Sequence, residues 1–136
     1  MIDFHSETDF ELANEENIQQ WISKIILDFD KEEGELQYVF CDDNYLHKLN
    51  VEFLDHDTLT DVISFDYTMG DLISGDIFIS IERVIDNAKD HNVSFVDELD
   101  RVIIHGILHY IGFKDKTEED AKLMRQKEDY CLSLRA

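Results

Sequence analysis

Residues 102–115 read V-I-I-H-G-I-L-H-Y-I-G-F-K-D, and the interpretation of the whole chain depends on this stretch. Before its last two residues, the only strongly polar side chains are His105 and His109. Because they are four residues apart, they lie one turn apart on the same face of a helix. Two imidazoles on an otherwise apolar helix need a partner, and a divalent metal ion is the obvious candidate. Gly112 lets the chain leave the helix and Asp115 follows three residues later, which predicts three protein ligands and an open coordination position.

The predicted helix is apolar around most of its circumference. His105 and His109 share one strip of it with Glu98 and Arg101, and this strip is predicted to face a cleft. Ser94 can cap the helix, and the acidic residues that follow favour its first turn. The other positions form a wide apolar face, made of Leu99, Ile103, Ile104, Ile107, Leu108, Tyr110 and Ile111.

The composition indicates a single globular domain over residues 1–136. Hydrophobic residues make up 43% of the 136, which is enough to bury a sizeable core. No apolar run is long enough to cross a membrane, and the acidic N-terminus does not resemble a signal peptide. Cys41 and Cys131 are too few and too far apart for a disulfide framework or a cysteine zinc site, so we expect a reduced, cytoplasmic protein.

The net charge of −20 is unevenly distributed along the chain. Residues 1–113 hold 26 acidic and 6 basic side chains, whereas residues 114–136 hold 6 of each. Such a chain should not bind nucleic acid broadly, and we expect no DNA partner, because the phosphate attraction behind non-specific binding is missing. Any contact with RNA has to be local, and the basic residues nearest the motif are Lys114, Lys116, Lys122, Arg125 and Lys127.

Hydrophobic periodicity predicts strands and helices that alternate along the chain. Gly34 is expected to end the first helix, and Gly70 and Gly75 are expected to bracket a loop. This order predicts an α+β or α/β fold, a small mixed sheet packed with helices, whose topology stays open. The expected strands are 2–5, 36–41, 62–66 and 76–81, and the expected helices are 14–29, 42–53, 82–91, the motif helix and 117–134.

The ligand types of the motif predict hydrolysis. Neutral imidazole nitrogens and a carboxylate oxygen both suit one Zn²⁺ ion, and the oxygen also admits other divalent metals. A dication with a free fourth position lowers the pKa of bound water toward about 7, so the catalytic group is expected to be this water. An anionic Asp115 in place of a third neutral histidine should make that water less acidic.

The residue after the first histidine separates two classes of hydrolase. In metalloproteases with H-E-x-x-H, the glutamate after the first histidine is the general base. Here Gly106 holds that position, so a zincin-like metal site on a buried helix lacks the peptidase base. Thr60, Asp61 and Ser64 are candidates to line the cleft, although a polar strand entrance explains them equally well.

The chain resembles the YbeY family of bacterial endoribonucleases in three blocks. The family signature H-G-x-L-H-x-x-G-Y-D-H is similar to H-G-I-L-H-Y-I-G-F-K-D, residues 105–115. A second block, related to L-N-x-x-(aromatic)-R and T-[DN]-V-L-S-F, is similar to residues 49–65, and G-D-I-x-I-S is similar to residues 75–80. The resemblance implies a zinc-dependent enzyme that cleaves single-stranded RNA in late 16S ribosomal RNA 3′-end maturation, with the small ribosomal subunit and its proteins as partners.

Three positions depart from the family pattern. Asp115 stands where the family usually has a third histidine, and Lys114 stands where it has aspartate. Leu54 replaces a basic residue of the second block, so a phosphate contact would fall to another group, such as His56 or Lys114.

Three other functions use similar features. A metzincin-like peptidase shares the ligand spacing, although Gly106 argues against it. A ribosome-binding assembly factor with a structural metal is favoured by the acidic charge, which suits basic ribosomal proteins. An iron oxygenase also uses two histidines and one carboxylate, although a helical histidine pair followed by aspartate fits hydrolases better.

Overall fold

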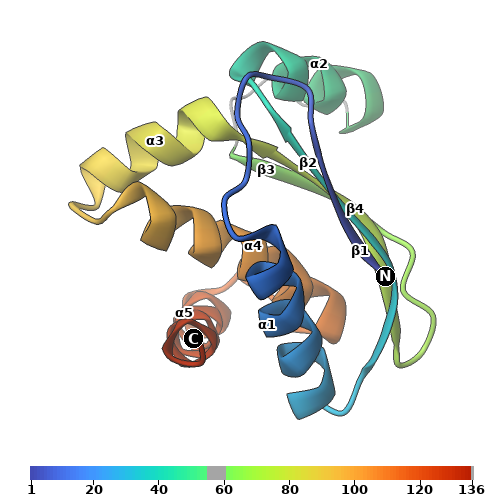
Figure 1. The fold of residues 1–136 in the computed structure, drawn as a ribbon. Helices are drawn as coiled ribbons and strands as arrows, with labels where there is room; N and C mark the ends of the chain where they lie inside the picture. The colour runs from blue at the N-terminus through green and yellow to red at the C-terminus, as the bar shows by residue number, and fades with distance from the viewer. Residues whose placement is uncertain (55–60, 136) are drawn as a thin grey trace.

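The structure is a computed structural model that describes residues 1–54 and 61–135. The side chain of Leu54 and the residues His56 and Thr60 lie outside the described part, so the expectations for them stay open. The elements, drawn in Figure 1, are β1 (Ile2–Ser6), α1 (Glu15–Asp28), β2 (Glu32–Cys41), α2 (Asp43–Leu54), β3 (Val62–Asp66), β4 (Leu72–Ser80), α3 (Ile81–Asp90), α4 (Phe95–Ile111) and α5 (Glu118–Ser133).

The four strands form one mixed sheet in the order β1-β2-β4-β3. β1 pairs with β2 and β2 with β4 in parallel, whereas the edge strand β3 runs antiparallel to β4. The α+β expectation of a small mixed sheet packed with helices is therefore confirmed, and the strand order supplies the topology that periodicity left open. Within the described ranges, no helix is long and apolar enough to span a membrane.

The sheet buries a different set of side chains on each face. Along β4, Ile77 and Ile79 belong to the main core with α1, α4 and α5, whereas Phe78 between them packs against a second cluster. That cluster lies under α2 and consists of Cys41, Leu46 and Ile63 with partly buried neighbours. Alternation along the strand explains the division, since successive side chains point to opposite faces. Figure 1 shows α2 set apart from the other helices at one end of the sheet.

Helix α4 is the central helix of the main core. Its apolar face includes Ile103, Ile104, Ile107 and Leu108, all fully buried, each stabilising the fold by roughly 1.5–3 kcal/mol. The Tyr38 hydroxyl of β2 donates to the carbonyl of Ile103 at 2.8 Å, which fixes α4 against the sheet.

The ends of α4 follow the sequence expectations. The Ser94 hydroxyl accepts from the Asp97 N–H at 3.1 Å, so Ser94 is the predicted N-cap. At the other end, Gly112 has φ +124°, a conformation that other residues rarely adopt, and it turns the chain away from the helix axis. Gly112 therefore determines where the chain leaves helix α4 after His109.

Two other glycines were misassigned from the sequence. Gly34 was expected to end the first helix, but it lies in β2, where the register with β4 shifts. Gly75 was expected in a loop, but it lies inside β4. In both places a neighbour lies where a Cβ atom would be, the Ser74 hydroxyl at Gly34 and the Tyr110 ring at Gly75. These glycines permit close packing rather than a turn.

Candidate metal centre

His105, His109 and Asp115 lie together at the C-terminal end of α4. The two imidazole rings are 4.6 Å apart between centroids and nearly perpendicular, at 80°. Asp115 Oδ2 lies 3.4 Å from His105 Nε2 and 3.5 Å from His109 Nε2. One ligand atom from each residue falls within 4.8 Å of the others. The three residues predicted from the spacing therefore lie together in the structure.

This arrangement fits a divalent ion by its donor atoms and their separations. Bonds of about 2.0–2.2 Å around a tetrahedral ion place ligand atoms about 3.4 Å apart. The observed separations from Asp115 to the two imidazole nitrogens, 3.4 and 3.5 Å, match that geometry. All three side chains keep some solvent exposure, with 22% for His105, 32% for His109 and 43% for Asp115, so an ion held by them would be accessible from solvent.

The segment after α4 returns Asp115 to the histidines because Phe113 anchors it. The Phe113 ring packs edge-on against Phe29 with centroids 5.7 Å apart, and Lys127 Nζ lies 5.8 Å from the Phe113 centroid. Phe113 also provides a backbone hydrogen bond to His109. A short turn fixed at one aromatic residue therefore positions both a ligand and the carboxylate that follows it.

The two histidines have different proton affinities. Burial lowers the pKa of His105, but the hydrogen bond and charge of Glu128 more than offset it, so that pKa lies above its ordinary value. Burial and the neighbouring His105 charge lower the pKa of His109. His109 is therefore the histidine more readily neutral, the form that a metal requires.

Glu128 is a residue of the site that the sequence analysis missed. Its carboxylate Oε2 lies 2.6 Å from His105 Nδ1, while Oε1 accepts from Arg101 Nη1 at 2.8 Å. It lies on α5, 23 residues after His105, so no local spacing indicates it. The strip predicted on α4 contained Arg101. Because a guanidinium beside the histidines needs an acidic partner, Arg101 was the one sequence feature that could have pointed to Glu128.

Gly106 faces the core rather than the cleft. A Cβ atom at this position would lie 2.7 Å from Cδ1 of Ile77, a fully buried residue of β4. A glutamate side chain here would therefore have to displace Ile77. The argument against peptidase chemistry therefore rests on packing as well as on the missing carboxylate.

The other cleft candidates have mixed positions. Asp61 is partly buried just before β3, and burial raises the pKa of its carboxyl against the influence of its backbone hydrogen bonds and of His105. Ser64 is exposed and hydrogen-bonds the Tyr110 side chain. Neither Asp61 nor Ser64 belongs to the group of candidate ligands formed by His105, His109 and Asp115.

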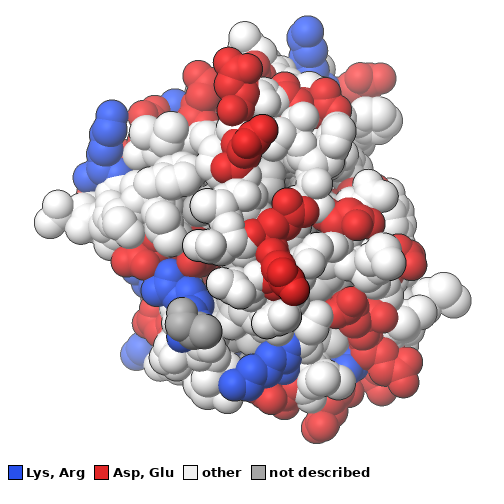
Figure 2. Space-filling view, in the orientation of Figure 1, with Lys and Arg blue, Asp and Glu red and all other residues white. Residues whose placement is uncertain are grey.

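Exposed basic residues lie on both sides of Asp115 in the sequence. Arg83, Arg101 and Arg135 all form ion pairs with carboxylates. Across residues 1–54 and 61–135, the exposed side chains of Lys114 and Lys116 form no ion pair, and the same holds for Lys122 and Arg125 on α5. Figure 2 shows acidic side chains spread over the visible face rather than gathered in one patch. Cations available to an anionic ligand thus occur next to the candidate ligands.

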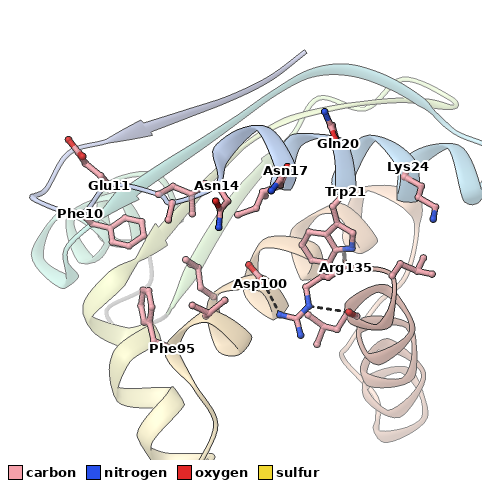
Figure 3. Close-up of a pocket in the computed structure, with 17 residues that line it drawn as sticks. Phe10, Glu11, Asn14, Asn17, Gln20, Trp21, Lys24, Phe95, Asp100 and Arg135 are labelled. Atoms are coloured by element: carbon pink, nitrogen blue, oxygen red, sulfur yellow. Dashed lines mark hydrogen bonds and ion pairs between the residues drawn. The ribbon is translucent and has the colours of Figure 1, made fainter.

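A well-defined hollow of the structure lies away from these candidate ligands. A cavity of about 710 Å³ lies between the N-terminal segment, α1, the start of α4 and the end of α5. Figure 3 shows Phe10 and Phe95 at one end of it and the Asp100–Arg135 ion pair toward the other. Asp100 precedes His105 by five residues, which is about 140° around a helix, so the two point to different sides. The cavity is therefore separate from the candidate metal centre.

Comparison with known proteins identifies the family. The family model described as Endoribonuclease YbeY matches residues 2–135. Proteins named Endoribonuclease YbeY from Flavobacterium johnsoniae and Christiangramia forsetii are 64% and 53% identical to this chain. Each alignment spans 98% of this chain, with 96% and 93% of the respective relative. The solution structure of Thermotoga maritima TM1509 superposes with a TM-score of 0.69 at 26% identity, covering 98% of this chain and 90% of that one. The resemblance read from the three sequence blocks is confirmed, and the chain belongs to the YbeY family.

Proposed function

We propose that this protein is a metal-dependent endoribonuclease that cleaves single-stranded RNA during late 16S ribosomal RNA 3′-end maturation. The observation that carries the proposal is the convergence of His105, His109 and Asp115 at separations suited to a tetrahedral ion. Family membership supports RNA as the substrate, since the relatives are named endoribonucleases. The buried free cysteines Cys41 and Cys131 support a reducing compartment, for which we propose the cytoplasm. The single main core that α1, α4 and α5 share with the sheet supports one domain over residues 1–136.

Each of the three candidate ligands would contribute one atom to the bound ion. His105 and His109 would hold the ion through Nε2, and Asp115 would hold it through Oδ2, with one zinc ion as the preferred occupant. When bound, such an ion supplies Lewis-acid polarisation and a nucleophilic hydroxide at neutral pH. The carboxylate oxygen of Asp115 also suits harder divalent ions, so we expect manganese to substitute for zinc.

RNA is proposed to reach the site along Lys114 and Lys116. These exposed cations flank Asp115, and no carboxylate in the described ranges neutralises them. They supply the local attraction for phosphate that a chain of net charge −20 otherwise lacks. Replacing both lysines with glutamine should raise KM for RNA and flatten its salt dependence, while leaving metal content unchanged.

A second function is favoured by the overall charge. An acidic surface suits basic ribosomal proteins, so a ribosome assembly factor with a structural metal would use the same fold. The two functions differ in one measurable respect, because the assembly factor needs the metal for binding to the small subunit and cleaves nothing.

The deciding experiment combines metal analysis with RNA cleavage. Metal content is measured first by elemental analysis of the purified wild type. Cleavage of single-stranded RNA from the 3′ end of 16S precursor is then compared for wild type and His109→Ala, with a peptide library as the second substrate. The matched control is His5→Ala, which removes a histidine with 67% side-chain exposure on β1, away from the ligands.

Each outcome has a clear meaning. We expect one bound ion, RNA cleavage by wild type and His5→Ala, a loss of at least about 100-fold in His109→Ala, and no peptide cleavage. A metal-free wild type would contradict the metal centre. Equal RNA cleavage by wild type and His109→Ala would exclude the nuclease, and metal-dependent binding to small subunits without cleavage would establish the assembly factor.

A further inference from the structure

We propose that Glu128 is a positioning residue of the metal centre, which holds His105 in the tautomer and orientation that present Nε2 to the ion. The proposal rests on the proposed ligand role of His105, His109 and Asp115. It adds a residue from α5 to a site whose ligands lie on α4 and in the segment that follows it.

The argument begins with the two oxygens of one carboxylate. Glu128 Oε2 lies 2.6 Å from His105 Nδ1, and Oε1 accepts from Arg101 Nη1 at 2.8 Å. An ionised carboxylate can only accept hydrogen bonds, so the hydrogen of this contact belongs to Nδ1 of His105. In the neutral imidazole that a metal requires, Nε2 is then the nitrogen with a free lone pair, and Nε2 is the atom that faces Asp115 at 3.4 Å.

Burial makes this contact difficult to replace with water. The Glu128 side chain is 8% exposed and the Arg101 side chain 19% exposed. A buried carboxylate needs a compensating cation, and Arg101 supplies one from the same strip of α4 that carries His105. Arg101 therefore fixes the Glu128 carboxylate through Oε1, and the carboxylate in turn orients the His105 ring through Oε2.

The two histidines are held by different parts of the chain. His109 has a hydrogen bond to the backbone at Phe113, within the turn that leads to Asp115. His105 depends on a side chain that is 23 residues away and belongs to a different helix. The position of α5 against α4 is therefore a condition for the correct orientation of one ligand and not of the other.

Variants of Glu128 and its neighbour separate this role from general stability. Glu128→Met removes the acceptor and keeps the volume, whereas Glu128→Gln keeps an oxygen that can accept from Nδ1. Asp129→Ala is the matched control, because Asp129 Oδ1 also binds Arg101, through Nη2 at 2.6 Å, but is 60% exposed. Zinc affinity is measured by chelator competition, and the Nδ1–H of His105 is observed by NMR in the metal-free and the zinc-loaded protein.

We expect Glu128→Met to weaken zinc binding about 10–100-fold, the effect typical of losing a hydrogen-bond partner of a ligand. The Nδ1–H signal of His105 should be slow to exchange in wild type and Glu128→Gln and absent in Glu128→Met. Glu128→Gln should lie between wild type and Glu128→Met in affinity, and Asp129→Ala should stay within about twofold of wild type.

Several results would overturn the proposal. Wild-type zinc affinity in folded Glu128→Met would exclude the positioning role, and an equal loss in Asp129→Ala would assign the effect to Arg101 pairing in general. If Glu128→Met does not fold, the double variant Arg101→Met/Glu128→Met leaves no buried charge unpaired and decides the matter by the same affinity criterion. Absence of zinc binding in wild type would remove the metal centre itself, whereas wild-type binding with an unaffected Glu128 variant removes only the role of Glu128.

Discussion

Among the ion pairs that join helix α4 to the C-terminal part of the chain, two start from adjacent residues of the helix. On one side Arg101 of α4 binds Glu128, which continues to His105. On the other side Asp100 of α4 binds Arg135 at 2.8 Å, beside the cavity shown in Figure 3. The two pairs start from adjacent residues and have similar lengths, but only the first continues to a candidate ligand.

The two ion pairs differ in whether the carboxylate also contacts a candidate metal ligand, and this contact decides whether the pair can affect metal binding. Glu128 has one oxygen on the guanidinium and the other on an imidazole. Asp100 has only Arg135 as a partner among the described side chains and borders a cavity. The first pair is expected to influence metal binding, and the second is expected to influence stability alone.

The largest effect is expected on the face of α4 that packs against β4. Gly106→Glu would place a carboxylate against Ile77 in the main core, where no cation is available. We expect a loss of more than about 4 kcal/mol in the free energy of unfolding, or failure to fold. Urea denaturation measures the loss, and Val96→Glu, at a position 60% exposed on the same helix, is the control. A stable Gly106→Glu protein would contradict the packing described for this face.

Replacing the arginine of each pair tests the comparison directly. Arg101→Met should cost about 2–3 kcal/mol and weaken zinc binding, because Glu128 keeps only His105 as a partner. Arg135→Met should cost about 1 kcal/mol and leave zinc binding unchanged, since Asp100 can be hydrated from the cavity. Thermal unfolding and chelator competition give the two values for each variant. Equal zinc affinities in the two variants would contradict the claim that only the Arg101–Glu128 pair affects metal binding.

Replacing Asp115, the third candidate ligand, tests which metal ion the site prefers. Asp115→His exchanges an oxygen ligand atom for a nitrogen. We expect the ratio of zinc to manganese affinity to rise about tenfold, because imidazole suits zinc better and carboxylate suits harder ions. Competition between the two metals measures the ratio, with Asp115→Asn as an oxygen-ligand control. An unchanged ratio would mean that Asp115 is not a ligand.

The smallest effect is expected on the cavity side, as a pH dependence. Burial raises the pKa of Asp100 above its ordinary value, and Arg135 offsets this only in part. Between the unfolded and the folded pKa, the folded protein binds more protons, so this residue makes stability fall as pH rises. Asp100→Asn cannot titrate, and the free energy of unfolding of wild type minus that of the variant should fall as the pH rises above the ordinary pKa of aspartate, about 4. A difference that rises over this range would contradict the sign.

Local features of the site and fold were predictable from the sequence. The i, i+4 spacing of His105 and His109 and the caps at Ser94 and Thr117 depend on residues within one or two turns. The glycine exit at Gly112 follows from the same short range, whereas the return of Asp115 also depends on the contact between Phe113 and Phe29. For these features the local pattern and the final structure agree because few distant contacts interfere.

The remaining features depend on contacts that no local pattern contains. Gly34 and Gly75 were read as chain breakers, although they permit Ser74 and Tyr110 to approach the strand backbone. Glu128 reaches His105 only after α5 has packed against α4. The strand order follows from connections between elements, which periodicity within each element does not determine.

The position of all three candidate ligands within residues 105–115 has a consequence for folding. An ion bound there would close a loop of only a few residues between the end of α4 and the start of α5, and the entropy of the unfolded chain changes little when such a short loop is closed. The apolar contacts that hold α4 on the sheet lie elsewhere, around Tyr38, Ile103 and Ile107. Unlike a zinc finger, whose folding depends on its ion, this domain should keep its fold when a chelator removes the metal. The ion would then be an exchangeable part of a preformed protein.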